Sequence, residues 1–527
     1  MTDATLFVGG RIFTGRRYCA ALLVEEGEVV LAGTEAEARR AAAPGTEVVP
    51  LGGDLVVPGL IDAHLHVAEV TRAREGLDVR EIGSAAALGE AIGRWASDHP
   101  NGPIEARGWD PERFPGGTWL DRRDLDQFAA DRPLVLVHVS GHALVANSSA
   151  LRAARIDRAT PDPPGGRIGR GSDGEPDGRL LEAAIPFFAS RRPAPPAIDP
   201  DALVRTLRSA AALGLTTVGA MNAAPEEAVA LRRLAAEGRW PGRVRVYLDG
   251  RRWQEYFEDP GGPSGPGGLF EVVGAKAFLD GAFGPRTAWL SAPYSDEPST
   301  SGGAVASADT LRAWIREITA RGLAPALHAI GDAAVALALD LLEGVTVRHL
   351  RRARIEHVSL TPPLLLPKLA RARPAIVVQP GFVWSDAWLG RRLGRDRARW
   401  AYAFRTLSEQ GHRLVGSSDA PYDSFDPWRG LRAAVQRTDP SGRSANPDPA
   451  EALDAEEALR LYTANAGAVF GEPRLGWLEA GSPADLVRVR APSLDAAIST
   501  GAPVVRETWI AGTRLDAPAD ATGARTR

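Results

Sequence analysis

Short apolar runs alternate with helix-like stretches through the centre of this chain, and that alternation limits the possible folds more than any other feature. Eight such runs follow one another: VVPGLIDAHLHV, LTTVGAMN, RVRVYLD, GAKAFLDG, ALHAIG, RIEHVSL, AIVVQPGF and HRLVGSSD. Amphipathic stretches such as PEEAVALRRLAAEG and DAAVALALDLLEG lie between them. Apolar strands joined by helices are typical of a parallel sheet that is buried on both faces. About eight of them favour a closed (β/α)8, TIM-like barrel over an open α/β sheet.

The two ends of the chain show a different pattern. Residues 4–57 hold short strands separated by glycine pairs, and ADLVRVRAP and VRETWIAGTRL near the C-terminus have the same character. We therefore expect residues 1–57 and 475–520 to form one composite β-sandwich beside a barrel domain of residues 58–474. Residues 68–200 fit the strand–helix alternation poorly, so they are predicted as an insertion after the first barrel strand. A long insertion at that face usually forms a lid or a pocket wall.

Composition excludes several classes of protein and partner. The 527 residues carry a formal net charge of -4, so neither nucleic acid nor a membrane surface is expected as a partner. The single cysteine, Cys19, excludes disulfides within the chain and zinc sites built from cysteines. The N-terminus lacks the pattern of a secretory signal, and no apolar run reaches 18 residues. We expect a cytoplasmic protein with a small-molecule substrate, and a homodimer is one assembly that the sequence allows.

Five of the apolar segments end on residues that commonly bind metals. They supply His64 and His66, Lys276, His328, His357 and Asp419, in that order. The carboxyl ends of parallel barrel strands meet at one face, so these six side chains are predicted to form a metal centre. Zinc is the expected ion, as one or two ions per subunit, with manganese or iron as alternatives. The alternative interpretation of the histidines is that they are hydrogen-bonded core residues.

Lys276 and Asp419 have further predicted roles. Lys276 is one of only two lysines in the chain and lies in an apolar strand, where a charge is costly. A neutral lysine can react with carbon dioxide to give a carbamate, which is able to bridge two metals. The alternative is a lysine that extends its amine to solvent or forms an ion pair, for example with Asp280. Asp419 can bind the ion, accept the proton of the attacking water and deliver it to the leaving group. Its alternative role is to start a turn before Ala-Pro.

These motifs together resemble the amidohydrolase superfamily, and within it the amidohydrolase-3 type that includes N-substituted formamide deformylase-like enzymes. The resemblance runs through nearly the whole chain, in VGGRIFTG, PGLIDAHLH, RGWDPERF, KAFLDGAFGPRTAWL, LHAIGDAAV, RIEHVSL, VVQPGF and GSSDAPYDSFDPW. It implies a (β/α)8 barrel with a composite sandwich and hydrolysis of a non-peptide C–N bond by a metal-activated hydroxide. It also implies that Lys276 is the carbamylated bridge and that Asp419 is the last ligand and the general base and acid.

The insertion is expected to contribute to the pocket. His142, in VSGHALVANSSAL, is predicted to contact the substrate or the transition state, with a structural role as the alternative. Trp109 and Asp110 are expected to shape the same wall. Glu182 is predicted to lie on a helix surface, with a position that reaches the pocket as the alternative. Apolar residues expected near the mouth suggest a hydrophobic substrate group beside the scissile bond, or else core or interface positions; they are Trp109, Phe382, Trp384 and Trp388.

Two other functions remain as alternatives to an acyclic amidase. A ring deaminase or cyclic amidase of the same superfamily is the first. Many such deaminases carry a glutamate three residues after the strand-five histidine, and this chain has Gly331 there, followed by Asp332. The second is a non-catalytic scaffold, which would be expected to have lost metal ligands, and all six are retained.

Overall fold

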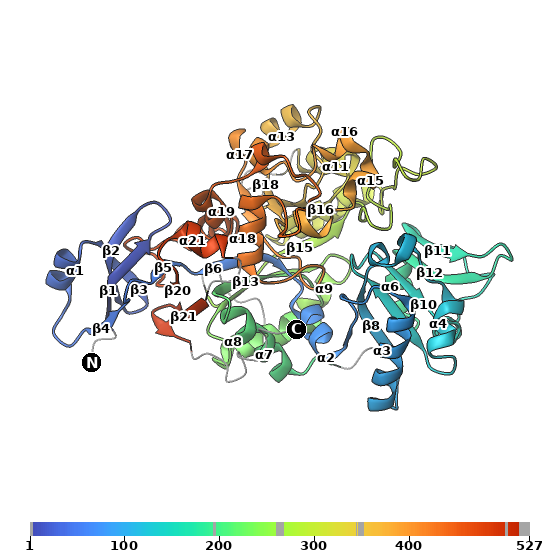
Figure 1. Ribbon diagram of the computed structural model, residues 1–527, viewed down its shortest axis with the longest axis horizontal. Helices are drawn as coiled ribbons and strands as arrows, with labels where there is room; N and C mark the ends of the chain where they lie inside the picture. The colour runs from blue at the N-terminus through green and yellow to red at the C-terminus, as the bar shows by residue number, and fades with distance from the viewer. Residues whose placement is uncertain are drawn as a thin grey trace.

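The computed structural model describes residues 4–192, 197–259, 268–343, 345, 352–500 and 504–515. Parts of the predicted domains lie outside these ranges, namely 1–3, 193–196, 260–267, 344, 346–351, 501–503 and 516–520. A central barrel separates a sheet formed by both ends of the chain from the insertion, and these two lie at opposite ends of the long axis (Figure 1). Within the described ranges, no helix is both long and apolar enough to cross a membrane.

The eight predicted central strands form one parallel sheet, which confirms the predicted barrel. Their order follows the sequence: β6 (Leu60–Leu65), β13 (Leu215–Ala223), β14 (Arg243–Asp249), β15 (Phe270–Phe278), β16 (Ala324–Ala329), β17 (Arg354–His357), β18 (Ala375–Val378) and β19 (Leu414–Gly416). Residues just after β19 join the sheet to β6. The Asp419 N–H donates to the His64 carbonyl at 2.8 Å, and the His66 N–H donates to the Ala420 carbonyl at 3.0 Å. The sheet is therefore nearly closed, and the seam falls at residues predicted to bind metal.

Amphipathic helices connect the barrel strands. The longer ones are α2 (Val67–Glu75), α7 (Pro200–Ala211), α8 (Pro225–Ala236), α10 (Ala308–Ala320), α11 (Asp332–Leu342), α13 (Leu366–Ala372), α18 (Pro427–Gln436), α19 (Ala455–Leu461) and α20 (Ala464–Val469). Several begin at a capping residue: the Ser307 hydroxyl accepts the Thr310 N–H at 3.1 Å at the start of α10. Short helices fill the loops, namely α9 (Trp253–Tyr256), α14 (Phe382–Ser385), α15 (Leu389–Leu393), α16 (Arg395–Ala398) and α17 (Phe404–Glu409).

Strands from both ends of the chain share a second sheet. It contains β1 (Ala4–Phe13), β2 (Tyr18–Glu25), β3 (Glu28–Gly33), β4 (Glu47–Pro50), β5 (Leu55–Pro58), β20 (Leu486–Arg490), β21 (Val504–Ile510) and β22 (Thr513–Arg514). The junction is the antiparallel pair of β5 and β20, so the ends meet as expected. Helices α1 (Glu35–Ala41) and α21 (Leu494–Ser499) lie in the same terminal segments. A sandwich architecture for this sheet stays a prediction.

The insertion has a six-stranded sheet of its own. Its strands are β7 (Leu77–Asp78), β8 (Ile104–Trp109), β9 (Leu134–His138), β10 (Ala143–Ala146), β11 (Gly166–Arg170) and β12 (Pro176–Glu182). Helices α3 (Ala85–Asp98), α4 (Arg122–Phe128), α5 (Ser148–Ala153) and α6 (Ala184–Ala189) accompany it. These strands bury their own apolar clusters, so the insertion has a separate core and is more than a loop.

Close backbone approaches hold the insertion against the barrel. A Cβ atom on Gly141 would lie 2.4 Å from the Tyr422 ring, and one on Gly165 would lie 2.2 Å from the Val305 carbonyl oxygen. Both glycines have a positive φ, at 71° and 73°. No side chain larger than hydrogen fits at either contact, so the insertion is seated directly on loops of the barrel mouth.

Candidate functional site

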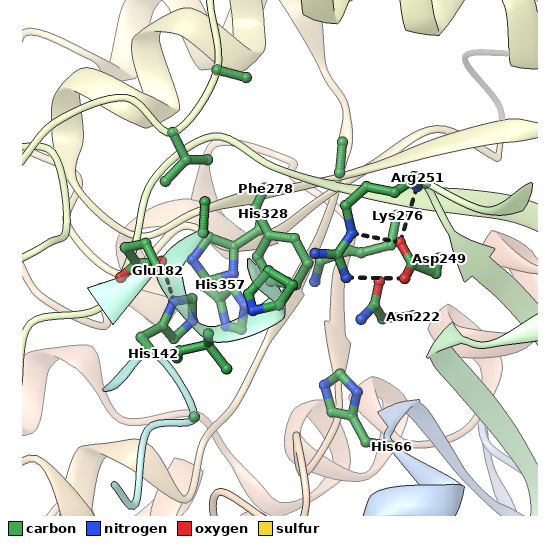
Figure 2. Close-up of a pocket in the computed structure, with 18 of the residues that line it drawn as sticks. His66, His142, Glu182, Asn222, Asp249, Arg251, Lys276, Phe278, His328 and His357 are labelled. Carbon is green, nitrogen blue, oxygen red and sulfur yellow. Dashed lines mark hydrogen bonds and ion pairs between the residues drawn. The ribbon is translucent and has the colours of Figure 1, made fainter. Parts of the chain in front are cut away.

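The structure brings all six predicted ligand residues together around one cavity of about 540 Å³. The cavity lies at the carboxyl ends of the barrel strands, and residues of the insertion cover part of it. Figure 2 shows His66, Lys276, His328 and His357 from the barrel facing the same space as His142 and Glu182 from the insertion.

Three ligand-type atoms converge at the barrel seam. The Asp419 Oδ1 atom lies 3.0 Å from His64 Nε2 and 3.1 Å from His66 Nε2. His64, His357 and Asp419 each offer one ligand atom, and these atoms lie within 4.8 Å of one another. His64 Nε2 is buried and has no hydrogen-bond partner of proper geometry among the described residues. An unpartnered imidazole nitrogen beside a carboxylate oxygen fits a divalent cation, which accepts both as ligands.

Three of the imidazoles are held in the tautomer that a metal ligand requires. His64 Nδ1–H donates to Glu356 Oε2 at 2.7 Å, and His357 Nδ1–H donates to Gln379 Oε1 at 2.8 Å. His328 Nε2–H donates to the Gly281 carbonyl at 3.1 Å. In each ring the second nitrogen keeps its lone pair, which is how proteins orient metal-binding histidines.

Burial favours the neutral forms of these rings. It lowers the pKa of His357 to about 3, despite the nearby Asp419 carboxylate. It also lowers the pKa of His328 well below its ordinary value, and the neighbouring His357 adds to that effect. Neutral imidazole is the form that binds metals, so these histidines can bind a metal ion near neutral pH without first losing a proton.

Lys276 is 2% exposed and projects from β15 into the cavity. Burial lowers the pKa of its amine to about 8, although Glu356 and Asp419 act in the opposite direction. The ammonium nitrogen lies 5.1 Å from the centre of the Phe278 ring. A lowered pKa increases the neutral fraction of the amine, which is the form that reacts with carbon dioxide.

The backbone takes an uncommon conformation at several strand ends around the cavity. His357 and Asp419 have φ values of 74° and 57°, and Asn222 and Glu182 have 53° and 52°. Left-handed backbone is rare outside glycine and clusters at functional sites, where the surrounding structure holds it in place. All four residues line the cavity.

The insertion contributes a hydrogen-bonded pair to the cavity. His142 Nδ1 lies 2.9 Å from Glu182 Oε2, and the two residues also pair through the Glu182 N–H and the His142 carbonyl. The His142 ring lies 4.9 Å from the His328 ring, measured between centroids. Glu182 ends strand β12 and lines the cavity, so its expected place on a helix surface was wrong. The segment GRLLE has two adjacent leucines and no apolar–polar alternation, so no local pattern marked it as a strand.

The other residues that the sequence suggested for the pocket wall lie elsewhere. Trp109 is 1% exposed and packs edge-on against Trp119 in the core of the insertion, with centroids 5.2 Å apart. The Asp110 carboxylate accepts the Glu112 N–H at 2.9 Å and begins a short helical turn. Neither residue lines the described cavity, and the same holds for Phe382, Trp384 and Trp388.

Sequence reasoning missed Glu356 and Gln379, which orient the ligands. Glu356 is fully buried, and Arg354 Nε donates to its Oε1 atom at 2.6 Å. Gln379 Nε2 in turn donates to the Ser417 hydroxyl at 3.0 Å. Arg354 and Glu356 lie two residues apart in β17, on either side of Ile355, and this spacing could have shown that both charged side chains point to the same face of the strand.

Comparison with known proteins agrees with this architecture. A sequence profile described as the amidohydrolase family matches residues 47–515. The chain belongs to the amidohydrolase family. Within it, YtcJ of Bacillus subtilis (strain 168) is 34% identical over 502 residues, covering 90% of this chain and 92% of that protein. N-substituted formamide deformylase of Arthrobacter pascens is 30% identical over 517 residues, covering 92% and 93%.

Solved structures show the same relationship. An uncharacterized metal-dependent hydrolase from Pyrococcus horikoshii OT3 matches this amidohydrolase with a TM-score of 0.75 and 29% identity. The match covers 93% of this chain and 98% of that one. The predicted resemblance is therefore confirmed, and the chain is assigned as an amidohydrolase-family hydrolase.

Proposed function

We propose that this chain is a metal-dependent hydrolase of a small amide and cleaves a C–N bond that is not a peptide bond. The observation that supports this best is the convergence of His64, His66 and Asp419 at the barrel seam, with Asp419 Oδ1 about equally far from both imidazoles. The cavity of about 540 Å³ suits a small molecule.

The proposed metal centre uses all six residues at the strand ends. His64, His66 and Asp419 would hold one ion, and His328 and His357 would hold a second, with carbamylated Lys276 between them. Zinc is the ion we propose for this set of nitrogen and oxygen ligands. Bound there, it would polarise a carbonyl oxygen and make water a stronger acid.

Asp419 is the residue we propose as general base and acid. Its carboxylate lies at the seam, 6% exposed, and burial would raise its pKa. His64, His66 and His357 outweigh that effect and hold the pKa well below its ordinary value. Asp419 is thus ionised near neutral pH and can accept a proton from water, then return it to the leaving nitrogen.

His142 is proposed to contact the substrate from the opposite side. Because Nδ1 is engaged by Glu182, the ring presents Nε2 for a hydrogen bond to the substrate amide. Glu182 therefore acts as a positioning residue that fixes the orientation of the ring.

The ring deaminase alternative lacks its usual acid residue at the cavity. Asp332, the acidic residue next to that position, accepts hydrogen bonds from the Ser291 N–H, at 2.9 Å, and from the Ser291 hydroxyl. It is not among the residues that line the described cavity. This arrangement disfavours ring deamination.

Metal analysis and a substrate panel test the proposal. Protein prepared with zinc should carry one or two ions per subunit and hydrolyse members of a panel of N-substituted formamides, N-acyl amines, hydantoins and lactams. In Asp419→Asn, turnover should fall by roughly 10²–10⁴-fold with the fold retained, because an amide cannot take the proton. Near-zero metal content would favour a scaffold, and activity of Asp419→Asn within a few-fold of the parent would exclude Asp419 as the base.

A further inference from the structure

One wall of the cavity is apolar and is built from parts of the chain that are far apart in sequence. Helix α6 of the insertion supplies Ile185 and Pro186, and the start of α10 supplies Leu311 and Trp314. Val305, in the loop before α10, also lines the cavity, and Gly165 of the insertion packs directly on its carbonyl oxygen. We call these five residues the apolar wall.

The apolar wall offers few hydrogen bonds to a ligand. Four of its five side chains are hydrocarbon, and the one polar side-chain atom, Trp314 Nε1, already donates to the Gly250 carbonyl at 2.9 Å. A polar group placed against these side chains would lose its hydrogen bonds to water without replacement, which costs free energy.

The charged groups around the cavity, apart from the six ligand residues, are already paired. Glu182 pairs with His142, and Asp249 accepts from Arg251 through both carboxylate oxygens, at 3.1 and 3.0 Å. Glu69 Oε2 accepts from the Tyr422 hydroxyl at 2.7 Å. Glu182 Oε1 is buried without a hydrogen-bond partner among the described residues, whereas none of the five side chains of the apolar wall offers a charged group or a free hydrogen-bonding atom to a substituent.

We propose that the apolar wall is the subsite for an uncharged hydrocarbon substituent of the substrate, and that Ile185 and Val305 determine specificity for it. This inference rests on the proposed amidase function and names its substrate class. The scissile amide would lie at the histidine end of the cavity, and an alkyl or aryl group attached to it would lie between α6 and α10. Burying one methylene is worth about a fourfold change in an equilibrium constant.

A homologous series of substrates tests the subsite. N-alkylformamides from methyl to hexyl, and N-methyl amides with acyl chains of the same lengths, would be compared with analogues that end in a carboxylate or an ammonium group. The wild-type kcat/KM should rise by up to about fourfold per methylene on one of the two sides of the amide, and the charged analogues should lose that gain. A flat series, or a preference for a charged analogue, would overturn the inference.

Ile185→Asp tests the wall directly. It should lower the ratio of kcat/KM for the longest substrate to that for the shortest by at least tenfold. Leu364→Asp is the matched control, because it makes a comparable change on a side chain that is 91% exposed and not part of the cavity, and it should keep the wild-type ratio. Should Ile185→Asp fail to fold, Ile185→Ala should lower the same ratio by a smaller factor. If a folded variant at Ile185 keeps the wild-type ratio of kcat/KM values, the proposal is wrong.

Direct binding separates this inference from the proposed function. If the metal-loaded protein hydrolyses no amide in the panel, the proposed function fails, and calorimetry with N-hexylformamide then decides the subsite. Weaker binding to Ile185→Asp than to the wild type and to Leu364→Asp would support it. Equal binding to all three proteins, or no binding to the wild type, would overturn it.

Discussion

Replacing Glu356 by glutamine should weaken both the barrel and the metal centre. Glu356 and Arg354 are fully buried, and Arg354 Nε donates to the carboxylate at 2.6 Å. Burial by itself would raise the pKa of Glu356, but Arg354 and His64 together hold it well below its ordinary range, so the group is a carboxylate at neutral pH. The variant keeps the shape of the side chain and removes its charge.

The size of the effect follows from what remains in the variant. Arg354 stays buried with its charge, and its Nη1 atom already has no hydrogen-bond partner among the described residues. Removing one member of a buried ion pair typically costs about 3–5 kcal/mol. His64 also loses the carboxylate that orients its ring, and loss of such a partner typically costs about 10–100-fold in metal affinity.

Urea unfolding and metal titration measure the two effects separately. Unfolding should be followed by tryptophan fluorescence with zinc chelated, because bound metal would stabilise the folded state by mass action. With a slope of about 3 kcal/mol per molar urea, the midpoint should fall by about 1 M. Glu81→Gln is the matched control, since Glu81 pairs with Arg113 on the surface, at 2.9 Å, and surface pairs contribute little.

The reasoning would be refuted by a small effect. If Glu356→Gln unfolds at the same urea concentration as the wild type and binds zinc with unchanged affinity, the buried pair neither supports the barrel nor orients His64. A loss of metal affinity without a loss of stability would show that Glu356 orients His64 but does not stabilise the barrel.

Three further predictions follow from other parts of the structure. Lys276→Arg should lose turnover while the circular dichroism spectrum is unchanged, because arginine stays protonated and cannot form a carbamate; retained turnover and metal content would show that no carbamate is needed. Gly141→Val should raise KM and speed proteolysis of the insertion, because φ is 71° and a Cβ would lie 2.4 Å from the Tyr422 ring; unchanged proteolysis would mean that the contact does not hold the insertion. Burial raises the pKa of Asp386 to about 7, so the folded state keeps this proton longer than the unfolded state, and the free energy of unfolding should fall as pH rises from about 4 to 7. In Asp386→Asn, the urea midpoint measured between pH 4 and 8 should depend less on pH than in the wild type. Identical dependence in the two proteins would contradict the raised pKa of Asp386.

The barrel and its six candidate ligands could be predicted because their pattern is local. Each strand shows as a short apolar run, and each candidate ligand lies within a few residues of the end of one. The carboxyl ends of the parallel strands of a barrel meet at one face, and this general rule predicts that the candidate ligands lie close together in space. His64 and Asp419 are far apart in the chain, yet both could be placed at the seam in this way.

The pocket wall could not be predicted in the same way. Trp109 ends strand β8 and was predicted as a wall residue, but it is buried in the separate core of the insertion. The loop residues Trp384 and Trp388 likewise do not line the described cavity. An apolar side chain in a core and one in a pocket look alike in sequence, because both remove hydrocarbon from water.

The sequence alone determined the order of the strands, the barrel and the residues offered to a metal, since each depends on local periodicity and on the direction of parallel strands. Only the tertiary structure decided which side chains surround those residues. Ile185 and Val305 line one cavity because the insertion docks through glycines that permit close contact, and Glu356 meets His64 because the barrel closes at β6. Such contacts join segments with no shared local pattern, so their partners are fixed by packing across the whole molecule.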